Sequence, residues 1–252
     1  MAARTSKQGK YLYAVVPGPL DRAFDFTGLH GREVYAISNG RLAAIVSDVP
    51  DDKLRPERRH LAAQQEVLKR LLLEMPGLLP MSFGIIADGP RAIQKILTQN
   101  QEAFIRQLRR VVGMVEMGLR VAWDDPNIFE YFVNTHPELQ TARDRFLGPQ
   151  RNPSQEDKIE LGRLFDRLLQ EDRENYADEV ERVLSRSCRE IKRNKCRQEH
   201  EVMNLACLVP RTAQAAFEAD VFAAANLFDN HYSFDYNGPW APHNFVTLNL
   251  EL

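Results

Sequence analysis

Two hydrophobic periods are mixed along this chain of 252 residues, and their order constrains the fold more than any other feature. Short β-prone runs, with apolar residues adjacent or at every second position, are interleaved with longer runs in which apolar residues recur every three to four positions. The strands and helices that these runs predict follow no regular strand–helix repeat. We therefore predict an α+β fold with two sheet-based domains, spanning residues 1–113 and 114–252.

The first domain is predicted to contain about four strands and two helices. The strands are expected at residues 11–16, 33–38, 41–48 and 78–86, and the helices at residues 56–74 and 90–112. Asn39 and Gly40 join two of these strands. Asn-Gly between β-prone runs favours a two-residue loop with a type I′ turn, so we predict a β-hairpin here.

The second domain is predicted to combine four strands with several helices. The strands are expected at residues 115–123, 202–209, 231–236 and 244–250, and the helices after Pro126, from Ser154 to about Lys192, and at about 211–225. Asp124 and Asp125 are expected to cap the helix that begins near Pro126. The order strand, helices, strand, helix, strand, strand favours a ferredoxin-like domain with a long helical insertion.

Composition excludes several classes of function. The 33 Lys and Arg residues nearly balance the 35 Asp and Glu residues, so the chain has no overall field that would attract nucleic acid. No apolar stretch approaches the roughly 18 residues that a membrane span needs. The N-terminus is polar, and three cysteines are an odd number in a chain of this size, which is typical of reducing cytosol. We expect a cytoplasmic protein without a membrane span.

The sequence contains none of the common catalytic or phosphate-binding motifs. Cys188, Cys196 and His200 give the spacing C-x7-C-x3-H, which matches no common zinc pattern. On a helix, Cys196 and His200 would share a face, but two ligands do not make a metal site. The carboxylates of the long helix are interspersed with arginines, as on a solvated, salt-bridged face. We predict no catalytic residue, no cofactor and no metal.

One local basic cluster follows the acidic part of the long helix. It consists of Arg186, Arg189, Lys192, Arg193, Lys195 and Arg197. We expect this cluster near the C-terminal end of the helix, where cations favour the helix dipole. The alternatives are a docking patch for an acidic partner and, as the weakest hypothesis, a nucleic-acid contact that heparin retention would reveal.

Residues 234–246 are aromatic, rich in Gly and Pro, and almost uncharged. Asn237-Gly238-Pro239 predicts a turn between two strands. We expect this turn to fold the Trp240 indole back over the C-terminal sheet, so that it is buried between Phe234, Tyr236 and Phe245. The alternative hypothesis is that Trp240 anchors a partner, in which case its loss would leave stability unchanged.

Four segments together resemble the gas vesicle protein F/L family, over about residues 10–250. They are Tyr11–Val16, Leu78–Ile85 with its Leu-Pro-x-x-Phe-Gly pattern, Glu116–Val121 with its Glu-x-Gly-Leu-Arg-Val pattern, and the closing run Phe234–Val246. The last is the most specific, because so many aromatic, Gly and Pro residues seldom occur together. Ser82 stands where the family often has Arg, and Ala241 and His243 stand where it often has Pro and Tyr.

The resemblance implies a non-enzymatic accessory protein needed for assembly of the gas vesicle, a protein-walled flotation organelle. It implies binding to the small hydrophobic shell protein, limiting its aggregation during nucleation, and contacts with other accessory proteins, in the cytoplasm and associated with the vesicle. It also implies two α+β domains, the C-terminal one ferredoxin-like. The alternative is an enzymatic or small-molecule-binding α+β protein with a site between the two domains, near Trp123, Asp124 and Asp125.

Overall fold

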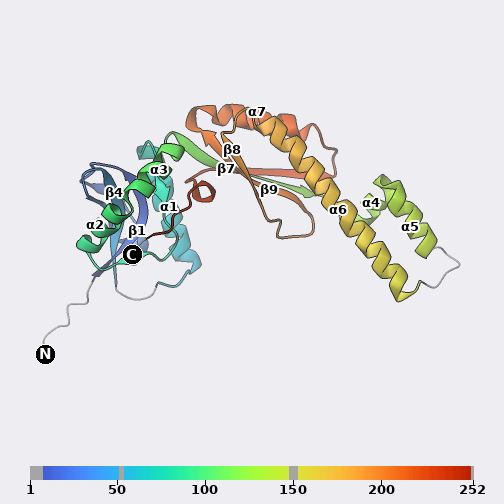
Figure 1. The fold of residues 1–252 in the computed structure, drawn as a ribbon, viewed down its shortest axis with the longest axis horizontal. Coiled ribbons are helices and arrows are strands. Elements are labelled where there is room, and N and C mark those ends of the chain that lie inside the picture. The colour runs from blue at the N-terminus through green and yellow to red at the C-terminus, as the bar shows by residue number, and fades with distance from the viewer. Residues whose placement is uncertain (1–7, 51–53, 148–152, 251–252) are drawn as a thin grey trace. The chain divides into compact units, whose positions relative to one another are not determined.

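The protein is described by a computed structural model that covers residues 8–50, 54–147 and 153–250 (Figure 1). Its contacts form two compact units, which are described separately below. The first contains the residues up to Glu116 together with those from Gly238 onward, and the second is Met117–Asn237. This clustering groups the C-terminal tail with the first unit, whereas the predicted division at residues 113 and 114 groups it with the second. The division into domains stays a prediction.

The first unit contains a six-stranded sheet in the order β2-β3-β4-β1-β5, with β6 also paired to β1. The strands are β1 (Gln8–Pro17), β2 (Ala23–Thr27), β3 (Glu33–Ser38), β4 (Leu42–Pro50), β5 (Leu79–Pro80) and β6 (Ile86–Ala87). Three helices, α1 (Arg58–Glu74), α2 (Pro90–Gln99) and α3 (Gln101–Val111), pack against this sheet (Figure 1). The core of the unit therefore lies on both sides of β1 and β4.

Strand β1 is buried on both of its faces. Tyr11 bonds α1, because its hydroxyl donates to the Gln64 Oε1 atom at 2.8 Å. Leu12 points to the opposite face, where it belongs to a hydrophobic cluster with Phe104 and Leu108 of α3. The amide of Gln64 is paired at its other end as well, since its Nε2 atom donates to the carbonyl of Met81 at 2.9 Å. Burial raises the pKa of Tyr11 to about 12.

Three predictions for the first unit need correction. The predicted strand 78–86 is two short strands, β5 and β6, that pair with different parts of β1. The predicted helix 90–112 is divided at Asn100, whose side chain donates to the carbonyl of Ile96. The hairpin of β3 and β4 is confirmed, but its turn is not type I′: Gly40 has a φ of 94°, and Asn39 is not among the described residues with positive φ. The Asn39 N–H donates to the carbonyl of Leu42, so Gly40 and Arg41 are the two central residues of the turn. Gly at the first central position is typical of a type II′ turn.

The second unit contains a four-stranded sheet in the order β10-β7-β9-β8. Its elements follow the chain as β7 (Met114–Trp123), α4 (Ile128–Thr135), α5 (Pro137–Leu147), α6 (Gln155–Leu184), β8 (Glu190–Asn194), β9 (Glu201–Pro210), α7 (Gln214–Ala225) and β10 (Tyr232–Trp240). With α6 and α7 as the two crossover helices, this is the βαββαβ order of a ferredoxin-like fold, and α4 and α5 are the insertion (Figure 1). The predicted α+β fold class is confirmed.

The long helix is shorter than predicted, because α6 ends at Leu184 rather than near Lys192. The next segment forms β8, which pairs antiparallel with β9 from Glu190↔Leu208 to Asn194↔Asn204. Ile191 is the single apolar residue of β8, so the local pattern does not predict a strand. The ladder with β9 decides its conformation, since strand formation depends on pairing more than on propensity.

The predicted turn at 237–240 and the predicted strand 244–250 are both wrong. The residues of the predicted turn belong to strand β10, which ends at Trp240. The segment His243–Phe245 is a short 3-10 helix, and the residues after it have no strand pairing. Val246, Leu248 and Leu250 instead pack onto the hydrophobic cluster of the first unit. No helix among the described residues has the length and apolar character of a membrane span.

Candidate functional site

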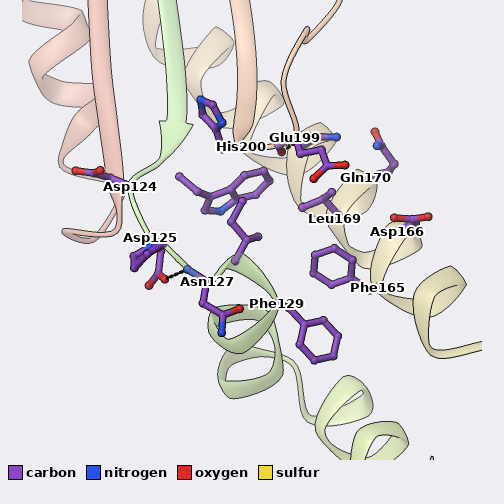
Figure 2. Close-up of a pocket in the computed structure, with 14 residues that line it drawn as sticks. Asp124, Asp125, Asn127, Phe129, Phe165, Asp166, Leu169, Gln170, Glu199 and His200 are labelled. Atoms are coloured by element: carbon purple, nitrogen blue, oxygen red, sulfur yellow. Dashed lines mark hydrogen bonds between the residues drawn. The ribbon is translucent and has the colours of Figure 1, made fainter. Parts of the chain in front are cut away.

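A groove of about 1060 Å³ lies within the second unit, where β7 ends (Figure 2). It is bounded by the segment after β7, by α4, by α6 and by the connection between β8 and β9. Its lining includes Trp123, Asp124, Asp125, Asn127, Phe129, Phe165, Asp166, Leu169, Gln170, Arg173, Glu199 and His200. The three residues named for the alternative function, Trp123, Asp124 and Asp125, all line it. Because every lining residue belongs to the second unit, this groove is not the expected site between two domains.

Backbone pairing fixes the end of β7 at the groove. The Trp123 N–H donates to the carbonyl of His200 at 2.8 Å, and the Asp124 N–H donates to the carbonyl of His231 at 2.7 Å. The expected aspartate cap of the next helix is wrong by two residues, because Asn127 caps α4 and accepts the Glu130 N–H. Asp125 instead accepts the Asn127 N–H at 2.8 Å and so holds the turn before the helix (Figure 2).

Aromatic rings form a connected wall in and behind the groove. The Phe129 and Phe165 rings lie 5.5 Å apart between centroids, and both are labelled on facing helices in Figure 2. Phe132 lies 5.4 Å from Phe165 and 5.5 Å from Trp123, in edge-on contacts. Trp123 itself is buried. These contacts join rings from α4, α6 and the end of β7 into one packed apolar wall.

The charges around the groove are predominantly negative. Asp124, Asp166 and Glu199 are exposed, and among the described residues none of the three carboxylates forms an ion pair. Asp125 lies 3.1 Å from the Nδ1 atom of His231. The one arginine of the lining is Arg173.

Arg173 is engaged by the protein itself. Its guanidinium donates to the carbonyls of Glu201 and Glu199, and it lies 5.5 Å from the centroid of the Trp123 ring. These contacts tie α6 to the start of β9. The groove thus offers aromatic surface and unpaired carboxylates, which suit binding by contact and charge.

The cysteine and histidine pair does not share a helical face. Cys196 and His200 both lie in the connection between β8 and β9. The Cys196 thiol is near the carbonyl of Val202, at 3.7 Å, and burial raises its pKa. Within residues 8–50, 54–147 and 153–250, no group of three His, Cys, Asp or Glu side chains could hold a metal ion.

The predicted place of the basic cluster, near the C-terminal end of the long helix, holds only for Arg186, which lies in the turn after Leu184. Lys192 and Arg193 belong to β8, and Arg189, Lys195 and Arg197 flank that strand. The Arg193 guanidinium donates to Glu181 and Asp178 of α6, and these hydrogen bonds raise its pKa. At least one cation of the cluster therefore ties the sheet to its covering helix.

The predicted burial of Trp240 is wrong, since 40% of this residue is exposed. The prediction required a turn before Trp240, but Asn237, Gly238 and Pro239 belong to strand β10, which ends at Trp240. Phe245 is the buried aromatic of the segment, with no exposed surface. Next to it, the Asn244 N–H and Nδ2 donate to the carboxylate of Glu116 at 2.8 and 2.6 Å. Phe245 and Asn244 hold the segment, while Trp240 offers aromatic surface to solvent.

Comparison with known proteins identifies the family. The family model described as "Gas vesicle synthesis protein GvpL/GvpF" matches residues 9–247, so the chain belongs to this family. Gas vesicle protein F of Nostoc sp. is 24% identical over 95% of this chain and 98% of its own length. Gas vesicle protein F of Streptomyces sp. is 29% identical over 84% of this chain and 87% of its own length. Gas vesicle protein L1 of Halobacterium salinarum is 24% identical over 96% of this chain and 92% of its own length.

Solved structures share the fold. The crystal structure of gas vesicle protein GvpF from Anabaena sp. PCC7120 has a TM-score of 0.85, covers 96% of this chain and 99% of its own, and is 23% identical. The crystal structure of GvpF from Microcystis aeruginosa has a TM-score of 0.80 and is 21% identical. It covers 95% of this chain and 99% of its own. The α+β architecture described above is therefore the architecture of these proteins.

Proposed function

We propose that this protein is a non-enzymatic accessory protein of gas vesicle assembly that binds the small hydrophobic shell protein and limits its aggregation during nucleation. Membership of the gas vesicle protein F/L family, over residues 9–247, carries the proposal. Association with the vesicle in the cytoplasm, together with other accessory proteins, is part of the same proposal.

An exposed aromatic on a rigid support favours a binding role. Trp240 is 40% exposed, although it lies in the most family-specific segment of the chain. The segment is held close by, because Phe245 is buried and Asn244 is bonded to Glu116. Tryptophans whose backbone is fixed before binding are typical interface hot spots, since little conformational entropy is lost when they are covered. We propose Trp240 as an anchor for the shell protein.

The chemistry of the groove is in keeping with a binding protein. The side chains that line it include carboxylates, aromatics, one arginine and one histidine, without serine or cysteine as a nucleophile. The carboxylates Asp124, Asp166 and Glu199 are exposed, and exposed carboxylates interact with a neighbour through water at high dielectric. Such groups bind charge more readily than they perform acid–base catalysis.

The proposal is tested by co-purification and light scattering. Tagged protein is incubated with freshly diluted shell protein, and both retention on the tag resin and the growth of scattering are followed. We expect retention of shell protein and a scattering rise that is delayed in proportion to the added protein. Shell protein in the flow-through, together with an unchanged scattering curve, would contradict the proposal.

A further inference from the structure

We propose that the groove of the second unit is a docking site for a protein segment in which an Arg or Lys side chain neighbours a bulky apolar side chain. The inference goes beyond the proposed function, because it concerns a surface other than the segment of Trp240. Three features of the groove carry it: a packed aromatic wall, a surplus of carboxylates, and an arginine already engaged by backbone carbonyls.

The aromatic wall supplies the apolar half of the site. Phe129 and Phe165 come from two different helices, α4 and α6, and their rings lie 5.5 Å apart. Leu169 follows one turn after Phe165 and lines the same space (Figure 2). Phe129 and Phe165 are half-buried, so each still offers part of its ring to the groove. Covering this surface with an aliphatic side chain removes apolar area from water on both partners.

The carboxylates supply the charged half. The lining contains the four carboxylates Asp124, Asp125, Asp166 and Glu199 against one guanidinium, that of Arg173. Asp125 is next to His231, but the other three have no ion-pair partner among the described residues. The net negative charge of this lining attracts a cationic side chain and disfavours an anionic one.

Arg173 offsets only one of these four negative charges. Two backbone carbonyls, of Glu199 and Glu201, accept hydrogen bonds from its guanidinium, and the Trp123 ring lies beside it. Its role is to fix the wall of the groove. An anionic ligand such as a phosphate or a nucleic acid would meet the unpaired carboxylates, so the groove disfavours it. A guanidinium or ammonium group, by contrast, can bond a carboxylate and contact an aromatic ring at once.

The chain provides its own reporter for a test. It contains two tryptophans, Trp123 in the groove and Trp240 outside it. In a Trp240→Phe variant, all tryptophan fluorescence comes from Trp123. The probe is the peptide acetyl-Leu-Arg-Leu-amide, and its matched control replaces Arg with citrulline, which has the same shape without the charge. We expect a saturable change in fluorescence with the Arg peptide and about fivefold weaker binding of the citrulline peptide.

Variants of the groove separate its charge from the charge of the whole protein. The double variant Asp166→Asn and Glu199→Gln should bind the Arg peptide about fivefold more weakly than the parent does. Its affinity for the citrulline peptide should be unchanged. The control double variant, Glu160→Gln and Glu179→Gln, removes two exposed carboxylates of α6 that do not line the groove, and it should bind both peptides like the parent.

Equal binding of the two peptides, or a fluorescence that stays constant with both, would overturn the inference. Equal weakening by the groove variant and the control variant would also overturn it, because the effect would then come from net charge alone. No shell protein is used, so either failure leaves the proposed function standing. Conversely, loss of shell-protein retention in the earlier assay leaves this inference standing.

Discussion

Strands β1 and β10 are both rich in aromatic residues, and they differ in almost every physical respect. Residues 11–16 of β1 have no exposed surface, whereas the last four residues of β10 are exposed. Strand β1 lies between β4 and the short strands β5 and β6, while β10 is an edge strand. Both segments belong to the family resemblance, so similarity of sequence alone does not separate a segment that builds the core from one that offers surface.

The tyrosine hydroxyls follow the same contrast. In β1, the Tyr13 hydroxyl lies 2.7 Å from the Ser47 hydroxyl and accepts the N–H of Leu29, all inside the protein. In β10, the Tyr236 hydroxyl donates to Glu218 at the surface. A buried hydroxyl without its partners would destabilise the fold, but one at the surface can exchange its partner for water. We therefore expect substitutions in β1 to affect stability and substitutions in β10 to affect binding.

The largest effect is expected for Tyr11→Ala. This change removes a fully buried ring and leaves the Gln64 amide without one of its partners. We expect the free energy of unfolding to fall by about 3–5 kcal/mol, measured by urea titration with circular dichroism. A loss below about 1 kcal/mol would mean that β1 is not the rigid core described here.

A smaller effect is expected for Tyr13→Phe. The ring is kept, but the Leu29 N–H and the Ser47 hydroxyl lose a buried partner. We expect a loss of about 1–3 kcal/mol in the same titration. The matched control is Tyr236→Phe, whose hydroxyl is at the surface and whose loss should change stability little. Equal losses for the two variants would remove the contrast between the strands.

Trp240→Ala should cost about 1 kcal/mol of folding stability, because only part of the indole is covered. Binding of the shell protein, in contrast, should be strongly weakened. The control is Phe222→Ala on α7, which removes an aromatic that is 60% exposed but lies outside the signature segment. A loss of several kcal/mol for Trp240→Ala would restore the structural role that the sequence predicted.

The smallest effect is a pH dependence at one end of β1. Burial alone would raise the pKa of Asp48, but hydrogen bonds from Lys10 and Tyr35 outweigh it and lower the pKa below 3.8. The ionised form is thus favoured by folding, so this stabilisation is complete above pH 3.8 and is lost as the pH falls through the lower folded pKa. We expect Asp48→Asn to flatten the acid limb of a plot of the free energy of unfolding against pH, by about 0.5 kcal/mol. Parallel curves for the variant and the parent would contradict this.

The sequence predicted those elements whose signal is local. The hairpin at Asn39 and Gly40 follows from the spacing of apolar and turn residues. The ferredoxin-like class of the second unit was predicted with one wrong strand, since the structure has β8 and no strand at 244–250. Strand β8 was missed because its conformation comes from pairing with β9 rather than from its own residues. The end of α6 was misplaced for the same reason.

The surface features were harder to predict than the core. Burial of Trp240 depended on whether residues 237–239 turn or continue the strand, and local residues favoured the turn. The groove is built from α4, α6 and the β8–β9 connection, which tertiary packing brings together from residues 123–200. Trp123 and the two aspartates were noticed in the sequence, but Phe129, Phe165 and Arg173 carry no local pattern that would join them to a site.

The assignment of the C-terminal segment as the binding surface is tested most directly by titrating shell protein against the Trp240→Ala and Phe222→Ala variants. Retention of shell protein and delay of its light scattering are measured beside the melting temperature of each variant. We predict that Trp240→Ala melts within a few degrees of the parent yet neither retains the shell protein nor delays its scattering. Phe222→Ala should still do both. Full activity of Trp240→Ala, or equal loss in the two variants, would contradict the assignment of the C-terminal segment as the binding surface.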